Sequence, residues 1–198
     1  MKTYRINEIF YSLQGEGVRA GEPSLFLRFS GCNETCTIQT HGFDCDTEFV
    51  SGRDMTSEEI LEVFKELSSD CKWVILTGGE PALQLDEALI TFLKSHGYKL
   101  AIETNGSIEL PEGLDWITVS PKVAEHAIRQ LVADEVKYVR GYGQALPKTV
   151  VKATHKLISP AFNGNGLDKK TLDWCIKLVE ESPQWRLSVQ QHKVWSIR

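Results

Sequence analysis

The chain has 198 residues, of which 41% are hydrophobic and 25% are charged, as is typical of a globular protein with a substantial core. Its formal net charge of −5 disfavours a protein that holds a phosphate backbone, so we expect no nucleic-acid partner. No apolar run approaches the ~20 residues that span a bilayer, and residues 1–8 lack the apolar core of a signal peptide. We therefore expect a single domain over residues 1–198, a cytoplasmic location and no membrane partner.

The first predicted elements lead into a loop rich in cysteine. Residues 4–13 alternate apolar and polar side chains and predict a strand, and the apolar run 24–29 predicts a second one. Between them, residues 14–17 (QGEG) favour a plain turn, although two glycines around a carboxylate also allow close approach to a ligand. Arg28 is the misfit on the second strand. It either points to solvent or aims its guanidinium into a cavity to bind a carboxylate.

Three of the five cysteines follow this strand, at Cys32, Cys36 and Cys45. A disulfide would use two of them, and the reducing cytosol disfavours it. A zinc site could use the three cysteines and His41. An iron–sulfur cluster needs only the three thiolates and leaves one metal position open, as a catalytic centre requires. The loop alone leaves zinc and iron–sulfur as alternatives.

The rest of the chain alternates predicted helices and strands. We expect helices over residues 56–67, 83–95, 123–132 and 168–181, the last with Leu172, Ile176 and Val179 facing inward. We expect strands over residues 72–77, 98–103, 116–119, 135–140, 156–160 and 185–189. This order predicts an α/β fold in which a mostly parallel sheet curls into a partial barrel, with the helices outside.

The polar ends of the predicted strands indicate one shared site. The cysteine loop and residues 77–80, 103–105 and 120–122 each follow the carboxyl end of a strand, where ligands bind in such folds. Glu80, which follows two glycines, offers a carboxylate that can hold an ammonium group.

Seven motifs in order carry a resemblance to a known family. They are LQGEG (13–17), RFSGC (28–32), CDT (45–47), TGGEP (77–81), IETNG (102–106), VSPK (119–122) and WRLSVQ (185–190). Together they resemble the 7-carboxy-7-deazaguanine synthase family of the radical S-adenosylmethionine (SAM) superfamily, from about residue 4 to the C-terminus. Any one motif is weak, whereas seven in the right order are highly specific.

The resemblance implies a radical SAM core, which is an incomplete TIM-like barrel, and the activity of a carbon–nitrogen lyase. Members carry a 4Fe–4S cluster on three cysteines, and SAM binds its fourth iron. One electron breaks a carbon–sulfur bond of SAM, and the radical takes a hydrogen from C6 of 6-carboxy-5,6,7,8-tetrahydropterin. The ring contracts and ammonia leaves, which gives 7-carboxy-7-deazaguanine for queuosine or another 7-deazapurine. The family also implies Mg²⁺, a homodimer and an electron donor such as flavodoxin or ferredoxin.

The matched motifs imply the role of each residue. The cluster ligands would be Cys32, Cys36 and Cys45. The SAM site would include Asp44, Cys45, Asp46, Gly79, Ser120, Pro121 and Lys122, with residues 159–162 as a further segment. The substrate would contact Leu13, Gln14, Gly15, Arg28, Thr77 and the terminal carboxylate of Arg198. Arg28 would bind the substrate carboxylate and Thr47 would bind Mg²⁺, which makes these two the catalytic residues.

Two positions depart from the family pattern. Many members carry a cysteine where this chain has Gly42, so Cys36 becomes the second cluster ligand and His41 stays an alternative. Ser159 stands where relatives carry glutamine. Two other functions are weaker. A glycyl-radical activase of the same superfamily would not need Arg28 and Thr47. A zinc-binding module would give no function to the motifs at residues 78–81 and 120–122.

Overall fold

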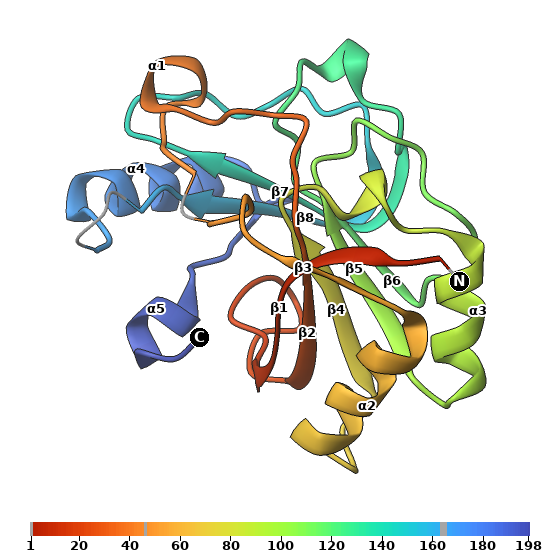
Figure 1. Ribbon diagram of the computed structural model, residues 1–198. Helices are drawn as coiled ribbons and strands as arrows, with labels where there is room; N and C mark the ends of the chain where they lie inside the picture. The colour runs from red at the N-terminus through yellow and green to blue at the C-terminus, as the bar shows by residue number, and fades with distance from the viewer. Residues whose placement is uncertain (1, 46, 163–165) are drawn as a thin grey trace.

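A computed structural model of the protein describes residues 2–45, 47–162 and 166–198. Within these residues one sheet has the strand order β3-β1-β2-β4-β5-β6-β7-β8-β9, and it is curved but not closed (Figure 1). The strands are β1 (Tyr4–Leu13), β2 (Pro23–Phe29), β3 (Arg53–Met55), β4 (Trp73–Gly78), β5 (Lys99–Thr104), β6 (Trp116–Val119), β7 (Val132–Arg140), β8 (Lys152–Pro160) and β9 (Arg186–Leu187). Strand β1 is antiparallel to β2 and β3, and every other neighbouring pair is parallel. The expected partial barrel of mostly parallel strands is confirmed.

The helices of the described residues are α1 (Ile38–His41), α2 (Ser57–Leu67), α3 (Glu87–Ser95), α4 (Lys169–Glu180) and α5 (Gln191–Trp195). Helices α2, α3 and α4 pack on the outside of the sheet, whereas α1 belongs to the cysteine loop and α5 to the end of the chain (Figure 1). The predicted capping box is present at the start of α2, where Thr56 accepts from the backbone of Glu59 and the Glu59 carboxylate accepts from the backbone of Thr56. None of the helices in the described part of the chain has the length and apolar composition needed to cross a bilayer.

Two apolar layers attach the helices to the sheet. In the first half of the chain, Phe64 of α2 and Leu93 of α3 are fully buried against Leu76 and Leu100 of the sheet. In the second half, Cys175 of α4 packs against β7 and β8. Each fully buried large side chain contributes ~1.5–3 kcal/mol, so these layers hold the strand ends in fixed positions.

The inner face of the sheet has an apolar floor and a polar upper layer. Phe26, Ile75 and Ala101 lie in register on β2, β4 and β5 and cluster with Phe10. Side chains of a strand alternate between its two faces, so the residue two positions further on shares the same face. Those residues are Arg28, Thr77 and Glu103, which are polar. The alternation therefore brings a cation, a hydroxyl and a carboxylate to one end of the barrel.

Residues 123–132 do not form the helix that we expected. The structure has only a 3-10 turn over Glu125–Ala127, and β7 already begins at Val132. The backbone N–H groups of Arg129 and Gln130 donate to the carbonyl of Gly106, at 2.8 and 3.1 Å, instead of to a preceding helical turn. A tertiary contact therefore replaces the helical bonds.

Other expected boundaries differ by a few residues. A 3-10 turn over Pro81–Leu83 delays α3, which begins after the N-cap Asp86. Strand β8 begins four residues earlier than expected, because it pairs with β7 along its whole length, and β9 keeps only two of the five expected residues. On α4 the predicted inward face is displaced by one position. The buried residues are Thr171, Cys175 and Leu178, whereas Leu172, Ile176 and Val179 are half-buried.

Candidate active site

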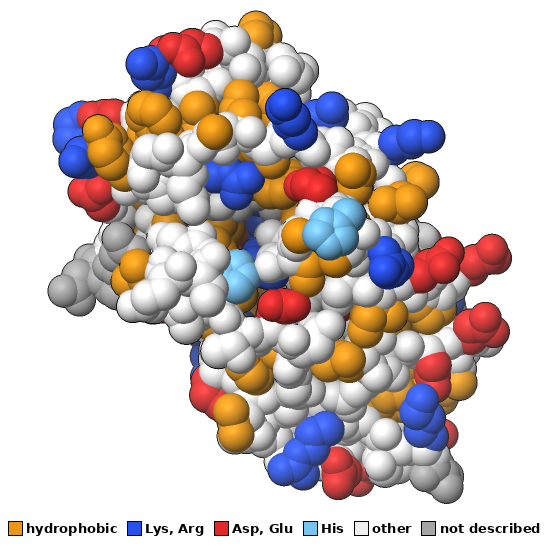
Figure 2. Space-filling model, turned by 90° about the horizontal axis from the view of Figure 1, so that it is seen from above, with side chains coloured by type: hydrophobic (Ala, Val, Ile, Leu, Met, Phe, Trp, Pro, Cys, Tyr) orange, Lys and Arg blue, Asp and Glu red, His pale blue; other side chains and the backbone are white. Residues whose placement is uncertain are grey.

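Two adjoining cavities lie at the carboxyl ends of the parallel strands. The first has a volume of about 200 Å³ and is lined by the three loop cysteines, so we call it the cysteine cavity. The second, about 210 Å³, is lined by Arg28, and we call it the arginine cavity. Five residues line both cavities and form a shared wall: Glu16, Thr47, Thr77, Glu103 and Gln190. Figure 2 shows the molecule from above, with a hollow near the centre of this face and basic side chains inside it.

The structure brings most of the predicted site residues to these cavities. The cysteine cavity is lined by Cys32, Cys36, Asp44, Cys45, Gly79, Ser120, Lys122, Ser159, Pro160 and Phe162. The arginine cavity is lined by Leu13, Gln14, Gly15, Arg28 and Arg198. Thr47 and Thr77 belong to the shared wall. Within the described part of the chain Pro121 borders neither cavity, and Asp46 lies outside the described residues.

The three cysteine thiols face the same space. The backbone N–H of Cys45 donates to the carbonyl of Cys36 across 3.2 Å, which closes the loop between them. Burial raises the pKa of the Cys32 and Cys36 thiols, and the negative charge of neighbouring cysteines raises both further. A positive metal centre among the three thiols, which line one cavity, would offset this repulsion.

The turn between Cys36 and Cys45 is fixed by its neighbours. His41 Nε2 donates to the carbonyl oxygen of Lys122 across 2.8 Å, and Gln144 Nε2 donates to the carbonyl of His41 across 3.1 Å. Gly42 has φ 82°, a left-handed conformation that favours glycine, and a Cβ there would lie 2.6 Å from Gln144 Nε2. A cysteine is therefore disfavoured at this position by the backbone and by the packing.

The end of β4 passes unusually close to the residues before Cys32. A Cβ at Gly79 would lie 2.0 Å from the carbonyl oxygen of Gly31, and one at Gly78, where φ is 131°, would lie 2.1 Å from the carbonyl oxygen of Phe29. The backbone N–H of Gly79 donates to Phe29 O at 3.1 Å, and that of Glu80 donates to Gly31 O at 2.9 Å. The two glycines therefore let β4 bind directly to the start of the cysteine loop.

Glu80 does not face either cavity among the described residues, contrary to the expectation that it could hold an ammonium group of a ligand. It is fully buried and accepts hydrogen bonds from Thr104 Oγ1 at 2.7 Å, the backbone N–H of Asn105 at 2.7 Å and that of Ala82 at 3.0 Å. Burial raises the pKa of Glu80, although these three donors oppose the rise. Glu80 thus joins the loops that follow β4 and β5.

Lys122 lies in the wall of the cysteine cavity. Its Nζ donates to the carbonyl and the hydroxyl of Ser120, at 3.1 and 2.8 Å. Burial and the nearby charge of Lys137 lower the pKa of Lys122, while Cys36 and acidic neighbours oppose this. A half-buried cation beside the thiols favours a negatively charged ligand group in this cavity.

A carboxylate holds two guanidinium groups at the arginine cavity. Arg28 Nε lies 3.0 Å from Glu8 Oε1, and the Arg198 guanidinium lies 3.5 Å from Glu8 Oε2. The Ser12 hydroxyl donates to the backbone oxygen of Arg198 across 2.8 Å, which fixes the last residue of the chain at the cavity. The ion pair of Arg28 with Glu8 does not have hydrogen-bond geometry. Arg28 Nε is therefore a buried nitrogen without a hydrogen-bond partner among the described residues.

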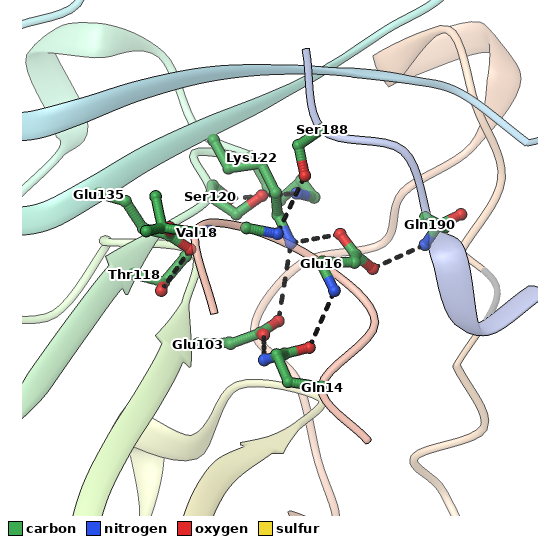
Figure 3. A network of polar contacts seen from close by, with 12 residues as sticks. Gln14, Glu16, Val18, Glu103, Thr118, Ser120, Lys122, Glu135, Ser188 and Gln190 are labelled. Carbon is green, nitrogen blue, oxygen red and sulfur yellow. Dashed lines mark hydrogen bonds and ion pairs between the residues drawn. The ribbon is translucent and has the colours of Figure 1, made fainter. Parts of the chain in front are cut away.

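A buried polar network fills the wall between the cavities (Figure 3). Lys137 on β7 forms ion pairs with Glu16 and with Glu103, and Gln190 Nε2 donates to Glu16 Oε1 across 2.9 Å. Glu103 was expected at this edge only as part of a strand end. Lys137, Glu16 and Gln190 were not predicted to belong to the site. Glu16 and Gln190 occur in the quoted motifs, which was an available signal, whereas nothing in the local sequence distinguishes Lys137.

Comparisons with known proteins agree with this geometry. The sequence model of the radical SAM superfamily matches residues 27–159. The 7-carboxy-7-deazaguanine synthase of Bacteroides thetaiotaomicron is 42% identical, over 98% of this chain and 98% of its own. That of Bradyrhizobium diazoefficiens is 38% identical, over 99% of this chain and 100% of its own. The chain belongs to the 7-carboxy-7-deazaguanine synthase family. The crystal structure of QueE from Escherichia coli has the same fold, with a TM-score of 0.72 and 25% identity over 96% of this chain and 95% of that chain.

The cysteine cavity fits the 4Fe–4S cluster and the SAM that the radical SAM superfamily implies. Its three soft thiols would leave one iron of a cubane cluster open to a further ligand. Among the described residues, no three His, Cys, Asp or Glu side chains converge closely enough to hold a single ion. The three thiols line one cavity, where Cys32, Cys36 and Cys45 would hold the cluster.

Proposed function

We propose that the protein is a 7-carboxy-7-deazaguanine synthase with a single radical SAM domain over residues 1–198. It converts 6-carboxy-5,6,7,8-tetrahydropterin to 7-carboxy-7-deazaguanine and ammonia. The observation that carries the proposal is the shared wall of the two cavities, because it puts a thiol-lined cavity beside one that holds an arginine. A radical source and a carboxylate-bearing substrate would then be direct neighbours.

The cofactors belong in the cysteine cavity. Cys32, Cys36 and Cys45 would hold the cluster, and Asp44, Asp46, Gly79, Ser120, Pro121 and Lys122 would surround SAM. When bound and reduced, the cluster and SAM supply a carbon-centred radical that takes a hydrogen atom from the substrate and later returns it. The protein's part is to hold the two ligands in line and to exclude water from the path between them.

The substrate belongs in the arginine cavity. Arg28 Nε is suited to a ligand carboxylate, because it makes no hydrogen bond among the described residues and its ion pair with Glu8 lacks hydrogen-bond geometry. The Gln14 amide is held by Glu103 at 2.8 Å, so it offers a fixed polar edge beside Leu13 and Gly15. Thr77 and the carboxylate of Arg198 complete the proposed substrate contacts.

Thr47 is the proposed protein ligand of Mg²⁺. It lines both cavities, so an ion bound to its hydroxyl oxygen would lie where substrate and cofactor meet. Mg²⁺ prefers hard oxygen ligands and keeps several waters, which substrate oxygens can replace. The ion would fix the orientation of the pterin carboxylate relative to Arg28.

The proposal also includes the partners of the enzyme. We propose that a flavodoxin or a ferredoxin supplies the electron, that the protein acts as a homodimer in the cytoplasm, and that its product enters 7-deazapurine synthesis such as that of queuosine. These points rest on membership of the family.

The test begins with anaerobic purification, followed by iron, sulfide and zinc analysis and an absorbance spectrum. About four irons and four sulfides per chain with a broad brown absorbance are expected. The enzyme is then supplied with the pterin, SAM, Mg²⁺ and a reductant. We expect equal amounts of 7-carboxy-7-deazaguanine and ammonia without net loss of SAM. A colourless protein with one zinc, or an iron protein that leaves the pterin unchanged, would overturn the proposal.

A further inference from the structure

Lys137 joins two carboxylates of the buried network in the shared wall. Its Nζ forms an ion pair with Glu16 Oε2, and it lies 3.7 Å from Glu103 Oε2. The side chains of Lys137, Glu16 and Glu103 are 5%, 14% and 25% exposed. One ammonium group therefore serves two carboxylates that come from separate parts of the chain.

The two carboxylates are also held by neutral donors. Gln190 Nε2 donates to Glu16 Oε1 across 2.9 Å, and Gln14 Nε2 donates to Glu103 Oε1 across 2.8 Å. The backbone N–H of Glu16 donates to Gln14 Oε1 across 3.1 Å. Lys137 is the one ammonium group bonded to both carboxylates within the described residues.

Neighbouring groups hold the segment that carries Glu16. The backbone N–H of Val18 donates to Glu135 Oε2, and that of Gly17 donates to the Ser188 hydroxyl, both across 2.9 Å. Glu135 also accepts from the Thr118 hydroxyl across 2.9 Å. The segment is thus fixed directly after Glu16, and Lys137 and Gln190 hold the carboxylate itself.

Lys137 and the two glutamates differ in which cavity they line. Glu16 and Glu103 line both the cysteine cavity and the arginine cavity. Among the described residues Lys137 lines the cysteine cavity and not the arginine cavity. Lys137 therefore meets the wall of the arginine cavity through its ion pairs with the two glutamates.

The charge of Lys137 and those of Glu16 and Glu103 stabilise one another. Burial works against the charge of Lys137, but Glu103 and Glu16 outweigh it and raise the pKa of Lys137. Burial also works to raise the pKa of Glu16, but Lys137 and Gln190 hold it well below its usual range. Removing one partner of a buried ion pair leaves an uncompensated charge. Without Lys137, the carboxylates of Glu16 and Glu103 would repel each other and one would turn away or take up a proton.

We propose that Lys137 is a positioning residue for the pterin: it fixes the carboxylates of Glu16 and Glu103 in the shared wall and thereby sets pterin affinity without touching the pterin. The inference rests on the proposed function, because it takes the arginine cavity as the pterin site. It adds a residue on β7 to a site otherwise built from β1, β2, β4 and the end of the chain.

The test measures binding of pterin-6-carboxylate, a fluorescent pterin, to the anaerobic holoenzyme. Lys137→Met is expected to weaken binding by at least about tenfold, because the charge-assisted hydrogen bond to Glu16 and the ion pair with Glu103 are both lost. Lys137→Arg keeps the charge and should recover most of the affinity. Lys156→Met is the control, since it removes a lysine from the neighbouring strand β8 that lines neither cavity among the described residues.

A double-mutant cycle tests whether Lys137 acts through Glu16. In a Glu16→Gln background, Lys137→Met should change the affinity less than about threefold, because the partner that it positions is already altered. Lys137→Met with the wild-type affinity, or an equal loss with and without Glu16, would overturn the inference. If Lys137→Met lacks the wild-type circular dichroism spectrum, Lys137→Gln takes its place in the same measurements, since it also removes the positive charge but keeps a polar side chain in the buried wall.

Measurements on the wild-type protein distinguish failure of the proposed function from failure of the role proposed for Lys137. If it does not bind pterin-6-carboxylate and does not turn over the pterin, the proposed function fails. If it does both and Lys137→Met binds equally well, only the role of Lys137 fails.

Discussion

His41 Nε2 donates to the backbone carbonyl oxygen of Lys122, and 2.8 Å separate the two atoms. His41 Nδ1 lies 2.7 Å from Thr40 Oγ1 and accepts its proton, so both ring nitrogens are engaged. The imidazole therefore uses both nitrogens in hydrogen bonds and links the cysteine loop to the segment after β6. This favours Cys36 over His41 as the second ligand of the proposed cluster.

Substitution of each candidate ligand tests this choice. Cys36→Ala should lose most of its iron after anaerobic reconstitution, because two cysteines cannot hold the cluster. His41→Ala should keep about four irons per chain, since the ring is engaged in hydrogen bonds. Iron analysis and the absorbance spectrum make the comparison. The reverse pattern, with iron lost only in His41→Ala, would assign the ligand to the histidine.

Gly42→Ala should destabilise the protein by ~1–2 kcal/mol from its left-handed backbone alone, and by more where its Cβ meets Gln144. Gly143→Ala is a matched control, because Gly143 has the same φ of 82° and a Cβ added there would have no described atom within 4 Å. Urea unfolding gives the loss in free energy of unfolding for both variants, and the difference between the two losses is the cost of the contact with Gln144. Equal destabilisation would mean that Gln144 moves aside without cost.

Arg28→Ala should weaken pterin-6-carboxylate binding by about 1.5–3 kcal/mol, or roughly tenfold to a hundredfold, because a charged hydrogen-bond donor is lost. SAM binding should change little, since Arg28 lines the arginine cavity. Arg5→Ala is the control: Arg5 is exposed and pairs only loosely with Asp54, at 3.7 Å. A full loss of SAM binding in Arg28→Ala, with pterin binding unchanged, would remove Arg28 from the substrate site.

Thr47→Ala should raise the Mg²⁺ concentration needed for half-maximal turnover while leaving the iron content unchanged. The reason is that the variant removes one hard oxygen from the proposed ion site in the shared wall. Thr47→Ser keeps the hydroxyl and should resemble the wild type. Magnesium titrations of the three proteins make the test, and a loss of iron in Thr47→Ala would contradict the assignment.

Glu80→Ala should lower the free energy of unfolding by about 3 kcal/mol or more, because three buried donors lose their acceptor. Glu66→Ala on the exposed side of α2 is the control and should stay within about 0.5 kcal/mol of the wild type. Urea unfolding followed by circular dichroism compares them. A loss as small as that of the control would show that water satisfies the three donors.

Local signals in the sequence predicted much of the fold. The capping box of Thr56 and Glu59 indicated the start of α2, and the apolar periods predicted β1, β2, β4 and β6 close to their true bounds. The rule that parallel strands present their carboxyl ends at one edge also predicted that the cysteines, Gly79 and Ser120 meet. The capping box and the apolar periods depend on residues that lie near one another in the chain, and the meeting of the strand ends follows from the common direction of the parallel strands.

The sequence by itself therefore determined most of the strand and helix order, the thiols and the motifs of the site, but not β3, α1 or α5. Only the tertiary structure decided which face of α4 is buried, why residues 123–132 are not helical, and where Lys137 points. Lys137 lies 121 residues from Glu16, and its burial depends on the register of β7 and on the path of the segment after β1. A charge is stabilised inside a protein only by the partners that folding brings to it, and no local pattern specifies those partners.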